Sequence, residues 1–288
     1  MLAKGAPSRD TCPMSSIDTC AGRIGIAVAG RELDATPILF LHGVGSDKSV
    51  WAPQLEHFGA SRPAVAIDYP GYGESDAKPN STRDDFAKAA LAALDAQEIE
   101  RAHICGLSLG GVVALALNAL SPDRCASLIL ADSFAVHPDG AAIFKRSADA
   151  SRASPMLALA EARAPALLGE AARGDAALVA QVIETMAAID PAAYRQGAEA
   201  VWLANQRERV AAVAVPTLVI VGSEDSITPP ALSRDLADMI RGARLVEIAG
   251  AGHLTNIEAP AAFNRAVAGF LNEIDVYSNG YRPLNLTP

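Results

Sequence analysis

The stretch from Ala102 to Leu117 reads AHICGLSLGGVVALAL, and it decides the fold. It joins a short apolar run to a longer apolar run through the pattern G-x-S-x-G at Gly106–Gly110. Between a strand and a helix, this pattern indicates a nucleophile elbow, a sharp turn that exposes a serine side chain. Such a turn leaves no room for neighbouring Cβ atoms, so glycines flank the serine. The sequence therefore predicts a strand, a strained turn at Ser108 and a helix.

A serine hydroxyl is a poor nucleophile at neutral pH, so it needs a base and a residue that orients the base. Two further apolar runs end in candidates: Leu218–Val221 is followed by Asp225, and Leu245–Ile248 is followed by His253. Residues at the carboxyl ends of parallel strands meet in one crevice. We therefore predict that Ser108, Asp225 and His253 act together as a catalytic triad.

Two other carboxylates are rivals for the orienting role. Glu224 lies next to Asp225, and Asp132 follows the apolar run Leu128–Leu130. Asp225 is favoured because the strand end that follows it carries the histidine. Asp132 remains the alternative. Asp225 also lies close to two prolines, and an aspartate in such a place ordinarily forms a turn, which is the competing structural explanation.

Donors for a developing oxyanion are predicted at two backbone positions. The apolar run Ile38–Leu41 leads into the glycine-rich sequence His42–Gly45, whose turn can direct N–H groups into a cavity. We assign the N–H of Val44 and that of Leu109, the residue after the nucleophile. His42 is interpreted as a structural residue that braces the turn.

From about Gly22 to Ile274 the chain resembles the α/β-hydrolase superfamily, in which serine, acid and histidine follow one another in this order. Within it, the chain is most similar to the 3-oxoadipate enol-lactonases and related small carboxylesterases. The resemblance is carried by Leu41–Asp47 with Trp51, Pro53 and Gln54, by Cys105–Gly111, by Pro216–Ile220, and by Gly250–His253 with Asn256–Glu258. One loop departs, with Pro70 and Tyr72 where enol-lactonases usually have arginine and histidine.

The resemblance implies an α/β fold with a mostly parallel central sheet, helices on both faces and an inserted helical cap. It implies a serine hydrolase that cleaves a small carboxylic ester or lactone through an acyl-enzyme, with Trp51 as a substrate contact. Carbon–carbon bond hydrolases and cofactor-free perhydrolases share the triad, and the scaffold can also serve as a ligand receptor; these readings stay open. The chain shows no phosphate loop or dinucleotide fingerprint, and we expect neither cofactor nor metal.

Residues 133–210 form an alanine-rich segment with a helical pattern, in which four prolines punctuate short helices. The segment lies where α/β-hydrolases insert a cap, and a cap shapes the pocket and excludes water. Trp202 is a candidate substrate contact. If the substrate bears a carboxylate, as enol-lactones do, Arg146 or Arg152 is the candidate to bind it, with a solvated helix face as the competing explanation.

Length and composition fit one domain with an insertion. The 288 residues are 50% hydrophobic, enough for a large core. We predict an α/β core over 22–132 and 211–275, a helical cap over 133–210, a partly mobile N-terminal extension over 1–21 and a C-terminal tail over 276–288.

Charge and cysteine content limit the partners. A formal net charge of −9 disfavours nucleic acids and anionic membranes, because both would repel the protein. No segment is long enough to span a membrane, and residues 1–13 lack the apolar core of a signal peptide. The four cysteines have no metal-ligand spacing and are expected to be reduced thiols. We predict a cytoplasmic protein with a small-molecule partner; a homo-oligomer is left open.

Overall fold

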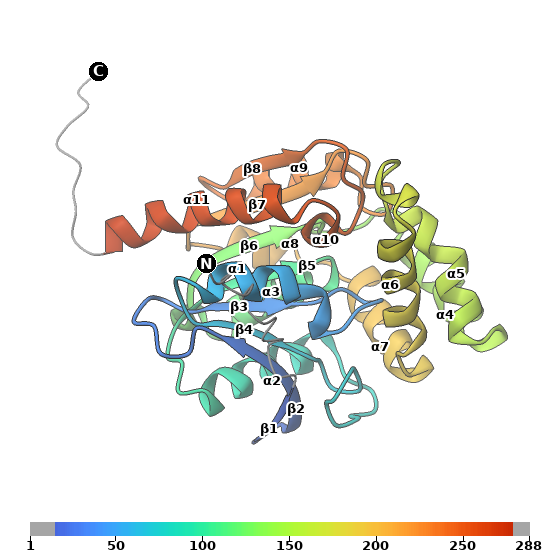
Figure 1. Cartoon of the computed structure of the whole chain (residues 1–288), viewed down its shortest axis with the longest axis horizontal. Coiled ribbons are helices and arrows are strands. Elements are labelled where there is room, and N and C mark those ends of the chain that lie inside the picture. Colours follow the sequence, from blue (N-terminus) through green and yellow to red (C-terminus); the bar gives the residue numbers. More distant parts are fainter. Residues whose placement is uncertain (1–14, 279–288) are drawn as a thin grey trace, which may run out of the picture.

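The computed structural model describes residues 15–278, which are built around one eight-stranded sheet (Figure 1). Its strand order is β1-β2-β4-β3-β5-β6-β7-β8. β1 and β2 are antiparallel to their neighbours, and all other neighbours are parallel. The strands are β1 (Ser15–Thr19), β2 (Gly22–Ala29), β3 (Ile38–Leu41), β4 (Ala64–Ile67), β5 (Ala102–Leu107), β6 (Cys125–Ala131), β7 (Thr217–Gly222) and β8 (Arg244–Ile248). The predicted mostly parallel sheet is confirmed.

The helices cover both faces of this sheet. The crossover from β3 through α1 to β4 runs along the sheet in the opposite direction to the crossover from β4 through α2 to β5. Right-handed crossovers therefore put α1 and α2 on opposite faces. α11 packs with α1 in front of the sheet in Figure 1, and α3 packs with α2. The helices are η1 (Lys48–Trp51), α1 (Ala52–Gly59), α2 (Arg83–Ala96), α3 (Leu109–Leu120), η2 (Pro122–Arg124), α4 (Gly140–Ala153), α5 (Met156–Leu167), η3 (Ala172–Gly174), α6 (Ala176–Ala187), α7 (Pro191–Trp202), α8 (Arg207–Ala211), α9 (Pro230–Met239), α10 (Thr255–Glu258) and α11 (Pro260–Ser278).

The helices α4 to α7 form a separate group beside the carboxyl ends of the strands, at the right in Figure 1. The chain enters and leaves this helical insertion at one neck, where Val136 and Asn205 form an antiparallel bridge. Gln206 fixes the neck to the core, because its N–H donates to Ala135 O at 2.8 Å and its Nε2 donates to Val112 O at 2.8 Å. α8 already packs on α3 and α9 of the core. The insertion thus ends earlier than the predicted boundary at 210.

The predicted ends of the core also differ from the structure. Residues 15–19 were expected in an extension, but they pair with β2 as an edge strand. The last helix continues to Ser278, beyond the predicted end near Ile274. Inside the insertion, Pro165 lies in the last turn of α5 rather than between helices. Residues 1–14 and 279–288, with most of the predicted extension and tail, lie outside the described residues.

No single helix in residues 15–278 is long and apolar enough to cross a membrane. α6 and α7 reach such a length and apolar composition only when they are taken together, and they are bent by 100° at the break between them.

Candidate active site

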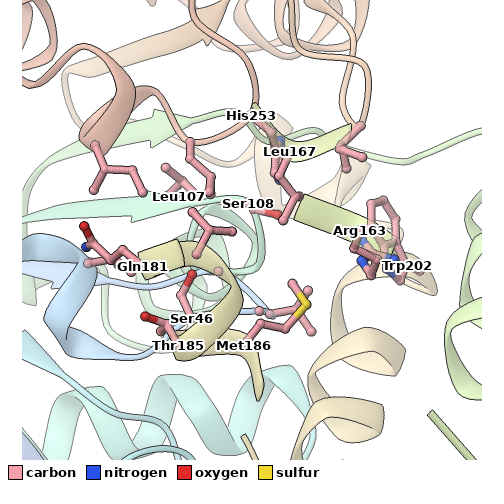
Figure 2. Close-up of a pocket in the computed structure, with 18 residues that line it drawn as sticks. Ser46, Leu107, Ser108, Arg163, Leu167, Gln181, Thr185, Met186, Trp202 and His253 are labelled. Atoms are coloured by element: carbon pink, nitrogen blue, oxygen red, sulfur yellow. The ribbon is translucent and has the colours of Figure 1, made fainter. Parts of the chain in front are cut away.

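Ser108 lies at the turn between β5 and α3 and has a backbone that residues with side chains rarely adopt, with φ +58° and ψ −113°. A Cβ on Gly110 would overlap the carbonyl of Leu41, which explains why this flank must be glycine. The turn is held because Ser108 N–H donates to Ala131 O at 2.8 Å, and Ser108 O accepts from Ser133 Oγ at 3.0 Å. Such strain persists where the surroundings impose it, and here it turns the serine side chain into a cavity (Figure 2).

Asp225 and His253 come together from the loops after β7 and β8. His253 Nδ1 lies 2.9 Å from Asp225 Oδ2. The carboxylate also accepts the Thr228 hydroxyl at 2.6 Å and the N–H groups of Ile227 at 2.8 Å and Thr228 at 2.9 Å. Both side chains are nearly buried, and His253 lines the same cavity as Ser108. His253 therefore pairs with Asp225 through a hydrogen bond and shares a cavity with Ser108.

Electrostatics set the protonation of this pair. Burial alone would raise the pKa of Asp225, but attraction to His253 and hydrogen bonds from His253 and Thr228 hold that pKa below its ordinary value. An ionised carboxylate only accepts hydrogen bonds, so Nδ1 of His253 carries the hydrogen. Nε2 is then the nitrogen that can accept a proton.

The rival carboxylates have other partners. Asp132, after β6, accepts Gly222 N–H at 2.9 Å and the Thr255 hydroxyl, and no hydrogen bond to His253 is found among the described residues. Burial and the nearby charge of Asp225 raise the pKa of Asp132 well above its ordinary value. Glu224 accepts the N–H of Glu170 in the insertion at 2.6 Å. Geometry thus favours Asp225 as the orienter.

The turn after β3 is braced by His42. Its Nδ1 donates to Gly43 O at 2.8 Å, and its Nε2 accepts Tyr69 N–H at 3.3 Å. Burial lowers the pKa of His42, which keeps the ring neutral in this arrangement. Within residues 15–278, the N–H groups of Val44 and Leu109 have no acceptor. Both amides are therefore free to bind an oxyanion next to Ser108.

Glu258 holds the loop that carries His253. Its carboxylate accepts the N–H of Gly252 at 2.9 Å and that of Leu254 at 2.9 Å, the two residues that flank the histidine. The same carboxylate accepts Gly169 N–H from the insertion at 2.7 Å. Sequence reasoning placed Glu258 in a resembling segment without giving it a role, although its position five residues after the histidine was the available signal.

The insertion covers the cavity that contains Ser108. The cavity holds about 30 Å³, and its insertion-side lining consists of Arg163, Leu167, Gln181, Val182, Thr185, Met186 and Trp202. Met186 extends to the turn that carries Val44, because its methyl group lies where a Cβ on Gly45 would be. Tyr72, in the loop that departs from the lactonases, donates its hydroxyl to Ala193 O of α7 at 3.1 Å and so anchors the cover.

The predicted substrate contacts divide into two groups. Trp202 lines the cavity, and Arg146 lies on an adjoining outer cavity instead. Two expectations are corrected. Trp51 is fully buried and stacks on Phe40 in the core, with ring centroids 4.9 Å apart, because it faces the sheet rather than the cavity. Arg152 is on the solvent side of α4, where it lies 3.7 Å from Asp149. Arg163, which sequence reasoning did not select, lines the cavity together with Trp202 (Figure 2).

Neither a cluster of metal-ligating side chains nor a disulfide is present in the described residues. Residues 15–278 contain no group of three or more histidine, cysteine, aspartate or glutamate side chains that could hold a metal ion. Cys20, Cys105 and Cys125 are free thiols. Cys12 lies outside the described residues.

Comparison with known proteins agrees with this architecture. Residues 38–266 match the model of the alpha/beta hydrolase family. The 3-oxoadipate enol-lactonase 1 of Acinetobacter baylyi is 29% identical over 253 residues, covering 87% of this chain and 94% of that protein. A putative carbamate hydrolase of Azorhizobium caulinodans is 32% identical over 252 residues, covering 83% of this chain and 92% of that protein. The crystal structure of the enol-lactonase from Burkholderia xenovorans superposes with a TM-score of 0.84 at 29% identity, covering 90% of this chain and all of that one.

The chain therefore belongs to the alpha/beta hydrolase family. The fold class and the family resemblance predicted from the sequence are both confirmed. Its relatives include hydrolases named for a lactone and for a carbamate. The comparison thus supports a hydrolase.

Proposed function

We propose that this protein is a serine hydrolase that cleaves a small carboxylic ester or lactone through an acyl-enzyme. The observation that carries the proposal is the cavity shared by Ser108 and His253, together with the 2.9 Å contact between His253 Nδ1 and Asp225 Oδ2. A nucleophile, a base and an orienter of the base are what acyl transfer to water requires. The relatives named for lactone and carbamate hydrolysis are consistent with attack on a carbonyl carbon.

The mechanism follows from the roles of these groups. His253 Nε2 takes the proton of Ser108 as its Oγ attacks the carbonyl carbon, and the N–H groups of Val44 and Leu109 stabilise the oxyanion. His253 then gives the proton to the leaving oxygen, and the carbon–oxygen bond breaks to leave an acyl-enzyme. A water that loses its proton to His253 attacks the ester carbon, and the same proton returns to Ser108. Asp225 stabilises the charged imidazole in both halves.

The size of the site points to small substrates. The cavity at Ser108 is small, about 30 Å³, and Leu167 and Met186 line it with apolar side chains. A closed apolar pocket also excludes bulk water from the attacked carbonyl. Short-chain esters should therefore be better substrates than long-chain ones.

The test is Ser108→Ala. Removing the nucleophile should lower kcat for p-nitrophenyl acetate on the order of 10⁴-fold to 10⁶-fold, because only binding and oxyanion effects remain. A fluorophosphonate probe should label the native protein at Ser108 and leave the variant unlabelled. Ser61 is exposed and lies outside the cavity, so Ser61→Ala is the matched control. This variant should keep native activity and native labelling. Labelling at another serine, or retained turnover in Ser108→Ala, would reject the proposal.

A further inference from the structure

A second cavity, the outer cavity, adjoins the one that contains Ser108. It holds about 350 Å³ and shares Arg163, Trp202 and Ile227 with the inner cavity. α4 and α5 supply most of its remaining lining, and Ser226 after β7 completes it. The two cavities therefore meet at these three side chains.

The lining of the outer cavity carries positive charge without compensating negative charge. Arg146 and Arg163 belong to the lining, which includes no aspartate or glutamate. This is unexpected in a chain with 24 basic and 33 acidic residues. The nearest acid on α4, Asp149, is already paired with Lys145 at 2.7 Å and lies 3.7 Å from Arg152. Within residues 15–278, neither cavity arginine has a carboxylate within ion-pair distance, whereas Arg152 on the same helix does.

Arg163 is the less solvated of the two cavity arginines. It is half-buried, and its one hydrogen bond within the described chain is long, at 3.5 Å from Nη1 to Ser147 Oγ. Its Nε is buried without any partner. A buried donor that makes no hydrogen bond costs free energy, and a guanidinium presents a planar fork of donors that fits a carboxylate. Arg146, which is exposed, stands at the rim of the same cavity.

We propose that the outer cavity is a carboxylate subsite, in which Arg163 binds an anionic group of the substrate and Arg146 assists from the rim. The favoured substrate is then a small ester or lactone that carries a free carboxylate a few bonds from the attacked carbonyl. The planar donor fork of Arg163, half-buried among mostly apolar side chains, fits a planar carboxylate, which favours a carboxylate over a phosphate dianion. Esterase activity in this inference rests on the proposed function, whereas binding of the anion does not.

The kinetic test compares an acid-bearing ester with a neutral ester of similar length. The acid-bearing substrate is mono-p-nitrophenyl glutarate and the neutral one is p-nitrophenyl valerate. The readout is kcat/KM for the glutarate ester divided by kcat/KM for the valerate ester. Arg163→Gln should lower this ratio about 10-fold to 100-fold, because a hydrogen-bonded charge pair is lost. Arg146→Gln should lower it by a smaller factor. Arg152→Gln, on the solvent side of α4, is the matched control and should keep the native ratio.

The binding test is independent of turnover. Glutarate and inorganic phosphate are titrated by calorimetry into the Ser108→Ala protein, with and without Arg163→Gln. Glutarate should bind more tightly than phosphate, and Arg163→Gln should weaken glutarate binding about 10-fold or more. Arg163→Lys keeps the charge and loses the fork, so it should give intermediate values and covers the case in which the glutamine variant does not fold.

The outcomes separate the two proposals. If neither ester is hydrolysed but glutarate binds in an Arg163-dependent way, the proposed function fails and the subsite stands. If both esters are hydrolysed with a ratio that Arg163→Gln leaves unchanged, the subsite is rejected and the proposed function stands. Tighter binding of phosphate than of glutarate would overturn the assignment to a carboxylate.

Discussion

Asp225 at the carboxyl ends of the strands and Arg163 in the helical insertion are held in opposite ways. At the strand ends, Asp225 is fully engaged by His253, Thr228 and two backbone N–H groups. In the insertion, Arg163 has one long hydrogen bond and a buried Nε without a partner in the described chain. Groups that are held by one another are preorganised for chemistry, and groups without partners are available to a ligand. The residues at the strand ends should therefore determine the rate of the chemical step, and the residues of the insertion should determine which substrate is preferred.

Replacement of Asp225 gives the largest effect expected from this comparison. Asp225→Asn should lower kcat about 10²-fold to 10⁴-fold, because the amide no longer stabilises the charged imidazole. The loss should be the same for p-nitrophenyl acetate and p-nitrophenyl butyrate, measured under saturation. Asp132→Asn is the matched control, since its amide can still accept from Gly222 N–H and donate to Thr255, and it should stay within a few-fold of native. A crippled Asp132→Asn beside a fully active Asp225→Asn would transfer the orienting role to the end of β6.

Replacement of Met186 should change the ranking of substrates instead of the chemistry. Met186→Ala removes the side chain that contacts Gly45 and lengthens the inner cavity. The ratio of kcat/KM for p-nitrophenyl hexanoate to that for the acetate should rise roughly ten-fold. The exposed Met239 in α9 provides the control variant Met239→Ala, which should keep the native ratio. An equal change for both esters would contradict the division of labour between sheet and insertion.

The smallest effect concerns stability and distinguishes the two aspartates within the strand ends. The pKa of Asp132 is raised by burial and by the charge of Asp225, so the folded state binds more protons than the unfolded state once the pH exceeds the ordinary carboxyl pKa. The free energy of unfolding should then fall as the pH rises through that window, by at most about 1.4 kcal/mol per pH unit. Asp132→Asn should flatten this slope in urea unfolding between pH 5 and pH 8. A slope identical to that of the native protein would show that Asp132 is ionised in the folded state.

The pKa of Asp225 predicts the opposite sign at lower pH. Because this pKa is depressed, the Asp225 carboxylate contributes stability above its unfolded pKa, and that contribution is lost as the pH falls through the folded value. Asp225→Asn should therefore reduce the acid dependence of stability below pH 5. Because it also removes a charge that raises the pKa of Asp132, the slope above pH 5 should end at a lower pH than in the native protein.

The sequence predicts the strand ends well because their signals are local. Apolar runs identify β3 and β5 to β8 within a few residues, and the glycines around Ser108 reflect a steric requirement. The edge strand β1 gave no such signal, since its sequence Ser-Ser-Ile-Asp-Thr is polar and mostly exposed. Its place depends on pairing with β2, which is a tertiary event.

The insertion was less predictable because the orientation of a helix depends on its packing. Arg146 and Arg152 lie six residues apart on α4, so they point about 120° apart around the helix axis. Composition alone therefore did not show that one lines a cavity and the other faces solvent. Arg163 escaped selection for the same reason, since nothing in the sequence of α5 shows which of its faces meets α4 and Trp202. Trp51 was assigned from a resembling segment, and only the packing on Phe40 shows that it belongs to the core.

The contact between the insertion and the loop of His253 has a consequence for how the cover moves. His253 N–H donates to Leu167 O at the end of α5 at 2.9 Å, and Glu258 joins Gly169 to the same loop. If the end of α5 lifts to admit a substrate, it pulls on the backbone of the general base. The uncovered protein would then have no aligned triad, so reactivity and exposure to bulk water exclude each other. Opening of the cover and alignment of the general base are thus coupled through the same hydrogen bonds.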